Sequence, residues 1–202
     1  FAFLKRREIK DVISYLKFII DNENIFHFKR IINLPSRGIG DKTIEKLLEL
    51  KDTENITLFE AIKRLHEITP SSKTEALIKF KTLIKELADK FDQMSLPEFY
   101  ECMLQETKYL EFLKEEEAED EESHRIDNIN EFKSILMQLE TRTDLQELSS
   151  KEKLLVGFDD VILDETLGTK QDVNGVVLST VHSVKGLEFK VVFVVALEEG
   201  LF

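Results

Sequence analysis

The sequence is poor in glycine, proline and cysteine, and it has no long uncharged apolar run. Seven glycines and three prolines among 202 residues are too few for a turn-rich β-sandwich or barrel. The single cysteine, Cys102, excludes a framework of intrachain disulfides and is typical of a reducing compartment. No uncharged apolar stretch reaches the roughly 18 residues that span a bilayer, so we expect no membrane segment. The remaining composition, 42% hydrophobic and 34% charged, favours a soluble protein rich in helix.

Basic residues are also scarce: the sequence has 28 Lys and Arg residues and 40 Asp and Glu residues, which gives a net charge of −12. This balance argues against a protein that coats nucleic acid through bulk charge, although it allows a local basic face. Residues 5–46 hold ten basic and six acidic residues, whereas residues 101–125 hold three basic and ten acidic ones. The acidic run at 115–122 predicts a solvated helix end or loop; the alternative is a role in repelling DNA or holding a basic partner.

Apolar residues recur at helical spacing along most of the first 140 residues. This spacing predicts helices over residues 8–21, 25–34, 42–50, 72–91, 109–114 and 123–140. Capping-box pairs mark the start of the helix at residues 72–91, with Ser72 and Glu75, and predict two further helix starts, at Thr57 with Glu60 and at Ser95 with Glu98. We therefore expect a bundle of about eight helices that folds alone.

The helical spacing of apolar residues ends near Thr169. Two β-branched runs, residues 176–181 and 191–195, flank a polar segment and predict two buried strands joined by a loop. Because two short strands do not form a stable sheet, we expect them to belong to a larger one. The chain starts at Phe1 and stops at Phe202 inside an apolar stretch, which indicates a piece of a longer protein.

Two glycines punctuate the basic segment between two predicted helices. In such a turn, glycine permits a positive φ and lets successive backbone N–H groups approach an anion, aided by the N-terminus of the following helix. Arg37 and Lys42 flank Gly38, Ile39 and Gly40, and the string is similar to the helix-hairpin-helix motif of DNA-binding proteins. We predict that these five residues bind DNA phosphates without reading bases. An ordinary helix–helix turn is the alternative.

A second candidate site follows the first predicted strand, at residues 179–189. It combines hydroxyl groups with the imidazole of His182, the ammonium of Lys185 and the carboxylate of Glu188. Loops at the carboxyl ends of strands are where α/β sheets bind ligands. Taken singly, His182 is more typical of a structural histidine, and Lys185 with Glu188 of an exposed pair. The whole string is far more specific than its members.

Residues 180–189, Thr-Val-His-Ser-Val-Lys-Gly-Leu-Glu-Phe, resemble motif V of the UvrD/PcrA/Rep family of superfamily 1 DNA helicases. Residues 191–202 resemble the stretch after that motif, and residues 3–11 resemble the pattern leading out of the second motor domain. Residues 32–40 resemble the glycine motif of the inserted helical subdomain, called 2B, and residues 125–132 a later segment of it. These segments occur in the family's order, while residues 50–120 add little that is specific.

The resemblance implies a mainly α protein: a 2B-like helical insert over residues 12–171, flanked by pieces of the RecA-like α/β motor domain 2A. Residues 1–11 and 172–202 would be those pieces, the latter contributing a β-loop-β segment. It further implies part of an ATP-dependent 3′–5′ DNA helicase of the bacterial cytoplasm that acts in DNA repair or replication. ATP and Mg²⁺ would be cofactors of the parent protein. Its partners would be the single-strand/duplex junction of DNA and repair or replication proteins.

The resemblance also implies roles for individual residues. The turn at residues 38–40 would contact the duplex backbone ahead of the fork. Thr180 and His182 would lie near the single strand, Glu188 would approach the ribose of the bound nucleotide, and Gly186 would permit close approach of the backbone there.

One departure from the family is large. The sequence contains no Gly-x-x-x-x-Gly-Lys-Ser/Thr loop to hold the β- and γ-phosphates, so we expect this chain alone to hydrolyse no ATP and to hold no cofactor or metal. Val184 replaces a common alanine, a modest change. Two other interpretations stay open: a helical protein-interaction or autoinhibitory module, and part of a helicase–nuclease.

Overall fold

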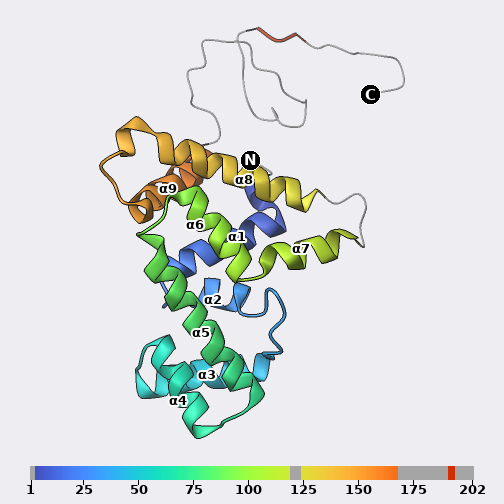
Figure 1. Ribbon diagram of the computed structural model, residues 1–202, viewed down its shortest axis with the longest axis vertical. Coiled ribbons are helices and arrows are strands. Elements are labelled where there is room, and N and C mark those ends of the chain that lie inside the picture. The colour runs from blue at the N-terminus through green and yellow to red at the C-terminus, as the bar shows by residue number, and fades with distance from the viewer. Residues whose placement is uncertain (1–2, 119–123, 168–190, 194–202) are drawn as a thin grey trace. The chain divides into compact units, whose positions relative to one another are not determined.

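The computed structural model describes residues 3–118, 124–167 and 191–193, and the chain divides into two compact units, residues 1–166 and 167–202. The prediction of a mainly helical protein is confirmed in the first unit (Figure 1). Its elements are η1 (Phe3–Lys5), α1 (Arg7–Ile20), α2 (Ile25–Ile31), α3 (Asp41–Glu54), α4 (Leu58–Ile68), α5 (Ser72–Phe91), α6 (Leu96–Glu106), α7 (Tyr109–Ala118), α8 (Arg125–Thr141), η2 (Thr143–Leu145) and α9 (Ser150–Leu167). None of the helices described is long and apolar enough to cross a membrane.

Two predicted capping boxes are confirmed, and one is wrong by a residue. The side chain of Glu60 accepts the Thr57 amide at 2.9 Å, and that of Glu98 accepts the Ser95 amide at 3.1 Å. The third helix start is capped by Ser71, whose hydroxyl accepts the amide of Thr74 at 3.2 Å. The tertiary structure decides this register, because the buried Thr74 hydroxyl also contacts a histidine of α4.

Helix α9 was not among the predicted helices, although it has a capping signal. Ser149 donates its amide to Glu152 at 2.9 Å and accepts the amide of Glu152 at 3.3 Å. The pair satisfies two of the N–H groups that the start of a helix leaves unbonded. The spacing Ser-x-x-Glu at residues 149–152 could therefore have predicted this helix start.

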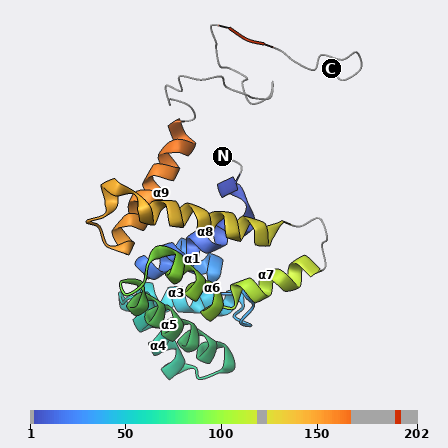
Figure 2. The ribbon, with the colours of Figure 1, turned by 45° about the horizontal axis from the view of Figure 1, so that its top comes forward.

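Helix α1 lies at the centre of the first unit and packs against α2, α5 and α8. Its buried residues face almost all directions, as expected for a helix surrounded by others: Ile9, Val12, Tyr15, Leu16, Phe18 and Ile19. Figure 2 shows α8 lying across α1, with α6 and α7 beside it. The contacts with α2 and α5 position the loop between α2 and α3 that is described below.

Helix α5 joins two groups of helices. It packs against α4, which contacts α3, near one end and against α6 near the other (Figure 1). The ring of Phe80 in the middle of α5 stacks on Phe18 at a centroid distance of 6.0 Å and meets Phe28 edge-on at 6.1 Å. Burial of each such ring contributes about 2 kcal/mol, so this aromatic cluster fixes α2 between α1 and α5.

The described residues do not test the predicted β-loop-β segment or the predicted domain limits. The β-loop-β segment lies outside them except for residues 191–193, which are exposed and in no regular element. The predicted boundary between residues 11 and 12 falls inside α1. The domain limits therefore stay predictions.

Candidate nucleic-acid interface

The loop between α2 and α3 contains the predicted turn at residues 38–40, called here the glycine turn. Gly38 has φ +68°, in the left-handed region where a side chain is strained. Gly40, the N-cap of α3, has φ −79° and ψ 163°, a conformation open to any residue. A Cβ built on either glycine meets no atom within 4 Å. The face of the turn that carries both glycines is therefore open.

Unbonded N–H groups gather along the glycine turn and the first turn of α3. Within the described residues, the backbone amides of Gly38, Gly40, Asp41 and Lys42 donate to no acceptor, whereas the Thr43 amide donates to the Gly40 carbonyl at 2.9 Å. The dipole of α3 adds partial positive charge at the same place. Lys42 is exposed beside these amides. The neighbouring Asp41 is also exposed, and its negative charge offsets the positive charge of Lys42. The arrangement suits an anion held mainly by backbone groups.

The side chain of Asn33 ties the start of the loop to its end. Its Oδ1 accepts the amides of Arg37 at 3.2 Å and of Ile39 at 3.1 Å, and its Nδ2 donates to the Ile39 carbonyl. The side chain of Ile39 is 1% exposed and packs into the core. Both backbone groups and the side chain of Ile39 are thus engaged within the protein, so this residue anchors the two glycines on either side of it.

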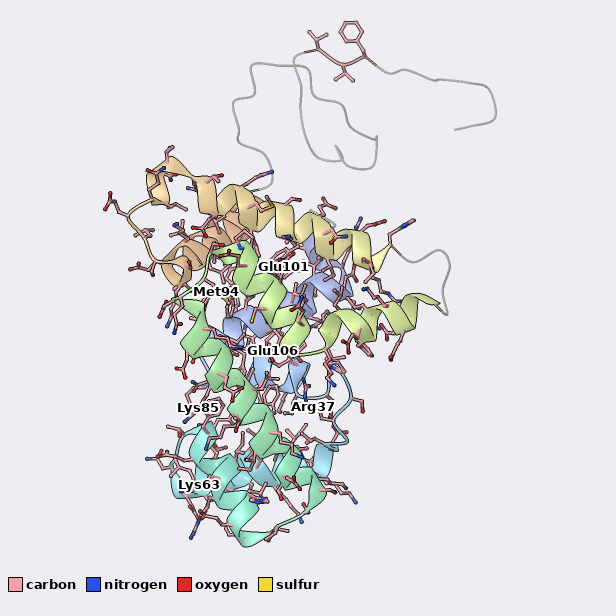
Figure 3. All side chains as sticks on the ribbon, in the orientation of Figure 1. Arg37, Lys63, Lys85, Met94, Glu101 and Glu106 are labelled. Carbon is pink, nitrogen blue, oxygen red and sulfur yellow. The ribbon has the colours of Figure 1, made fainter. Side chains whose placement is uncertain are left out.

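Arg37 lies at this loop (Figure 3), and the hydrogen bonds of its guanidinium go to groups of the fold, not outward. Its Nη2 donates to the Tyr15 hydroxyl at 3.0 Å, and its Cζ lies 5.1 Å from the ring centre of Phe80. Its Nη1 donates at 3.1, 3.0 and 3.1 Å to the carbonyl oxygens of Ile31, Ile32 and Pro35. A cation near the C-terminal carbonyls of α2 is favourable, since those groups lack helical partners.

Tyr15 supports the same loop from α1. Its hydroxyl donates to the carbonyl of Leu34 and accepts from Arg37. Burial raises the pKa of Tyr15, and the neighbouring Arg37 charge lowers it in part, so the hydroxyl stays protonated at neutral pH. The hydroxyl can therefore act as donor and acceptor at once.

Helix α2, which leads into the loop, is itself held by a buried carboxylate. Asp11 on α1 is 1% exposed and accepts Nε of Arg30 at 2.7 Å and the hydroxyl of Tyr109 at 2.8 Å. Burial raises the pKa of Tyr109, and the charge of Asp11 adds to this effect. These bonds join α1, α2 and α7 and fix the direction in which the chain enters the loop.

The structure therefore brings the first predicted site together and leaves the second undescribed. Gly38, Gly40 and Lys42 lie on the open face of the turn, whereas Arg37 and Ile39 point inward. Thr180, His182, Gly186 and Glu188 lie outside the described residues. Their predicted roles stay predictions.

The whole chain, residues 1–202, matches the family model described as the UvrD-like helicase C-terminal domain. The chain belongs to this family. It is 35% identical over 209 residues to the ATP-dependent DNA helicase PcrA of Bacillus subtilis (strain 168), across 99% of this chain. Proteins of the same name from Staphylococcus epidermidis (strain ATCC 12228 / FDA PCI 1200) and Staphylococcus aureus (strain NCTC 8325 / PS 47) are each 36% identical over 202 residues. The chain spans 27% of the length of each of these relatives.

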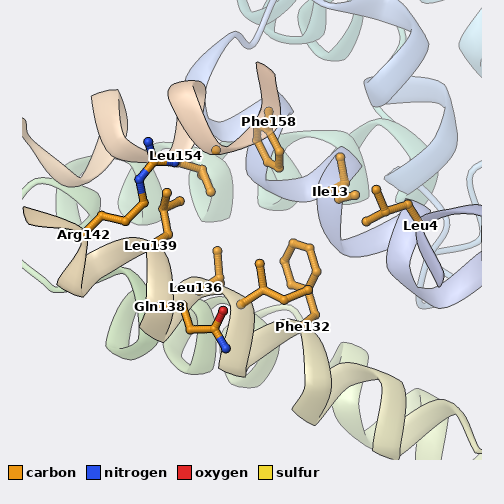
Figure 4. Close-up of a pocket in the computed structure, with 11 residues that line it drawn as sticks. Leu4, Ile13, Phe132, Leu136, Gln138, Leu139, Arg142, Leu154 and Phe158 are labelled. Carbon is orange, nitrogen blue, oxygen red and sulfur yellow. The ribbon is translucent and has the colours of Figure 1, made fainter. Parts of the chain in front are cut away.

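This UvrD-like helicase domain also has a cavity, which is unlike the glycine turn in chemistry. A cavity of about 260 Å³ lies between η1, α1, α8 and α9 (Figure 4). Its lining is apolar apart from Gln138 and Arg142, with Phe132 and Leu139 on one side and Leu154 and Phe158 on the other. Among the residues that the structure describes, no group of three or more histidine, cysteine or acidic side chains is placed to hold a metal.

Two residues that shape the interface were missed in the sequence. Asn33 lies inside the segment that resembles the family's glycine motif, and an asparagine before a turn is a common hydrogen-bonding device. That signal was available. Tyr15 lies 22 positions before Arg37 in the chain, and nothing local links the two residues.

Proposed function

We propose that this chain is part of an ATP-dependent 3′–5′ DNA helicase and that its glycine turn contacts the backbone of duplex DNA. Family membership and the names of the relatives support the helicase assignment. The open row of unbonded amides at the glycine turn supports the DNA contact, and it is the observation that carries this part of the proposal. The parent protein would act in DNA repair or replication in the bacterial cytoplasm.

The chemistry of the glycine turn suits a phosphodiester. The amides of Gly38 and Gly40 and the first amides of α3 can donate to phosphate oxygens, and Lys42 adds a positive charge. Such contacts position DNA without reading its sequence, as a helicase requires. Because Asp41 opposes Lys42 and the chain carries a net charge of −12, binding by this chain alone should be weak and sensitive to salt.

Gly40 provides the sharpest reason to expect a close ligand. Its φ and ψ require no glycine, and no atom of the protein lies where a Cβ would be. Serine, asparagine and aspartate are better N-caps than glycine or alanine. Neither the backbone conformation nor the packing of the described structure requires a glycine here. The missing side chain does, however, let the backbone of a bound DNA approach the amides.

The rest of the proposal concerns the motor. Residues 1–11 and 172–202 would belong to subdomain 2A, with Thr180 and His182 near the single strand and Gly186 and Glu188 near the nucleotide. ATP, bound with Mg²⁺ in the complete protein, would supply the free energy for movement along DNA. The insert at residues 12–171 would engage the duplex and regulate unwinding.

The first experiment measures fluorescence anisotropy of the 202-residue chain with labelled duplex, single strand and a 3′-tailed junction, at low and physiological salt. Gly40→Ser keeps a good N-cap and places a side chain over the amides. We expect it to weaken binding to duplex and junction by about tenfold or more, with little effect on single strand. Lys42→Gln should weaken duplex binding and reduce the dependence of log Kd on log salt by about 0.9.

Lys73→Gln is the matched control, because Lys73 is also an exposed lysine at the second position of a helix, α5. It should bind as the unmodified chain does. Absence of duplex binding at low salt, or equal losses on duplex and single strand in Gly40→Ser, would contradict the proposal. Either result would favour a helical protein-interaction module.

A further inference from the structure

We propose that Arg37 is a positioning residue that, together with Tyr15 and Asn33, holds the glycine turn in its DNA-binding conformation and is not itself a phosphate ligand. This inference rests on the proposed function of the turn. It differs from the prediction made from the sequence, in which Arg37 itself binds a DNA phosphate.

The donors of Arg37 face protein acceptors. Nη1 donates to three carbonyl oxygens of the loop and of the last turn of α2, at distances of 3.0 to 3.1 Å. Nη2 donates to Tyr15, and the guanidinium plane lies near the ring of Phe80. Arginine binds phosphate best through two parallel N–H groups, and here both terminal nitrogens already donate to protein acceptors, Nη1 to backbone carbonyls and Nη2 to Tyr15 on α1. Turning the guanidinium toward DNA would leave the carbonyl oxygens of Ile32 and Pro35 without their donor, although the Ile31 carbonyl would still accept the Leu34 amide at 3.0 Å.

The acceptors of Arg37 show what the residue organises. They lie on both sides of Leu34 in the loop, while Tyr15 brings in α1 and Phe80 brings in α5. One side chain thus joins two helices to the segment that leads into the glycine turn. The planar fork of arginine can serve such divergent acceptors at once, whereas lysine presents a single ammonium.

Asn33 completes the arrangement on the other side of the loop. It accepts the amide of Arg37 itself, so the backbone of Arg37 is fixed as well as its side chain. It also holds both backbone groups of Ile39, the residue between the two glycines. Gly38 and Gly40 therefore flank a fixed point, and their free amides point in directions that Arg37 and Asn33 decide.

The DNA-binding test compares Arg37→Lys with Arg37→Gln, each titrated with duplex and with single strand over a range of KCl concentrations. A phosphate ligand tolerates lysine, because lysine keeps the charge and binds phosphate well. A positioning arginine does not. We expect both variants to lose duplex affinity by a similar factor of about ten, with single-strand affinity retained. Tyr15→Phe, which changes no charge and lies buried, should weaken duplex binding in the same direction.

The second measurement needs no DNA and follows hydrogen exchange of the Ile39 amide, which Asn33 accepts at 3.1 Å. In Arg37→Lys and Tyr15→Phe we expect this amide to exchange about tenfold faster or more, while amides in the middle of α5 keep their protection. Asn33→Ala, which removes the acceptor of the Ile39 amide together with the bond from Nδ2 to the Ile39 carbonyl, serves as the positive control. An equal loss of protection throughout α5 would indicate general unfolding and contradict a local positioning role.

Two outcomes overturn the inference while leaving the proposed function intact. One is unchanged exchange at Ile39 in both variants. The other is near-normal duplex binding by Arg37→Lys when Arg37→Gln loses affinity and its salt dependence falls by about 0.9. Absence of duplex binding by the unmodified chain contradicts the proposed function itself, and with it any role of Arg37, Tyr15 and Asn33 in DNA binding.

Discussion

Glycine has opposite uses in two regions of this molecule. At the glycine turn, Gly38 and Gly40 face open space, and no atom lies within 4 Å of a Cβ built on either. In α9, a Cβ built on Gly157 lies 2.5 Å from Cδ2 of Leu139 on α8. At the glycine turn, glycine allows the left-handed φ of Gly38 and leaves the backbone amides of both residues open to an external ligand. Gly157 instead lets two helices approach each other, so the same residue type is a surface feature in one region and a packing feature in the other.

The two regions also use polar groups differently. Around the glycine turn, side chains bond mainly to loop backbone, through Asn33 and Arg37. Between α6, α8 and α9, Glu140 accepts Nζ of Lys153 at 2.6 Å and the Leu96 amide at 2.9 Å, which joins three helices through one carboxylate. Contacts of the first kind shape a surface, and contacts of the second kind hold helices together. Substitutions should separate the two roles.

The largest expected effect is that of Gly157→Val. The branched side chain would overlap Leu139 and push α9 from α8, even though the neighbouring cavity leaves Leu139 some room. We expect a loss of about 3 kcal/mol in the free energy of unfolding, measured by urea denaturation. In a Leu139→Ala background the same substitution should cost less than about 1 kcal/mol. Equal costs in both backgrounds would show that the close approach of Gly157 to Leu139 does not limit packing.

Glu140→Gln should have the next largest effect, about 2 kcal/mol at pH 7, because it leaves the largely buried ammonium of Lys153 without its charged partner. Burial favours a higher pKa for Glu140, but the bonds from Lys153 and the Leu96 amide outweigh it and lower the pKa below 4.5. A lowered pKa stabilises the folded state above the unfolded value, and the contribution is lost as pH falls through the folded value. The difference between wild type and variant, followed by denaturation at several pH values, should therefore shrink below about pH 4.5. A constant difference would contradict this assignment.

The smallest effects should be those at the glycine turn. Gly38→Ala places a side chain at φ +68° and should cost about 1 kcal/mol. Gly40→Ser has ordinary dihedral angles and open space, so its stability should change by less than about 0.5 kcal/mol. Thermal unfolding of the two variants measures both values. A large loss in Gly40→Ser would mean that the turn depends on Gly40 for folding and not only for access.

Most of the helices could be predicted from the sequence, because their signals are local. The apolar stripe of α5 and the pairs Thr57–Glu60 and Ser95–Glu98 lie within one helix or one turn. The capping pair predicted at Ser72 was wrong by one residue because Ser71 pairs with Thr74, whose hydroxyl also bonds to His66 on another helix. The start of α9 had a local signal, the pair Ser149–Glu152, that the prediction did not use.

The position of the candidate interface could also be predicted, but its internal organisation could not. Two glycines and the flanking charges of Arg37 and Lys42 locate the turn in the sequence. Only the fold distinguishes the two cations: Lys42 is exposed beside free amides, whereas Arg37 turns toward Tyr15 and loop carbonyls. A sequence pattern gives the charge of a side chain but not the direction in which it points.

By itself, the sequence determined the helical class, most helix starts and the place of the glycine turn, since backbone preferences and amphipathic spacing act over a few residues; the ends of α2, α3 and α7 differ from the predicted ones by three or four residues. The tertiary structure decided which residues of the turn face outward, which serine caps α5, and that Gly157 lies close to Leu139 of α8. Each of these depends on residues distant in the chain, such as Tyr15 with Arg37 or Leu139 with Gly157. Contacts of that kind exist only once the helices have packed, because packing alone brings the partners within reach.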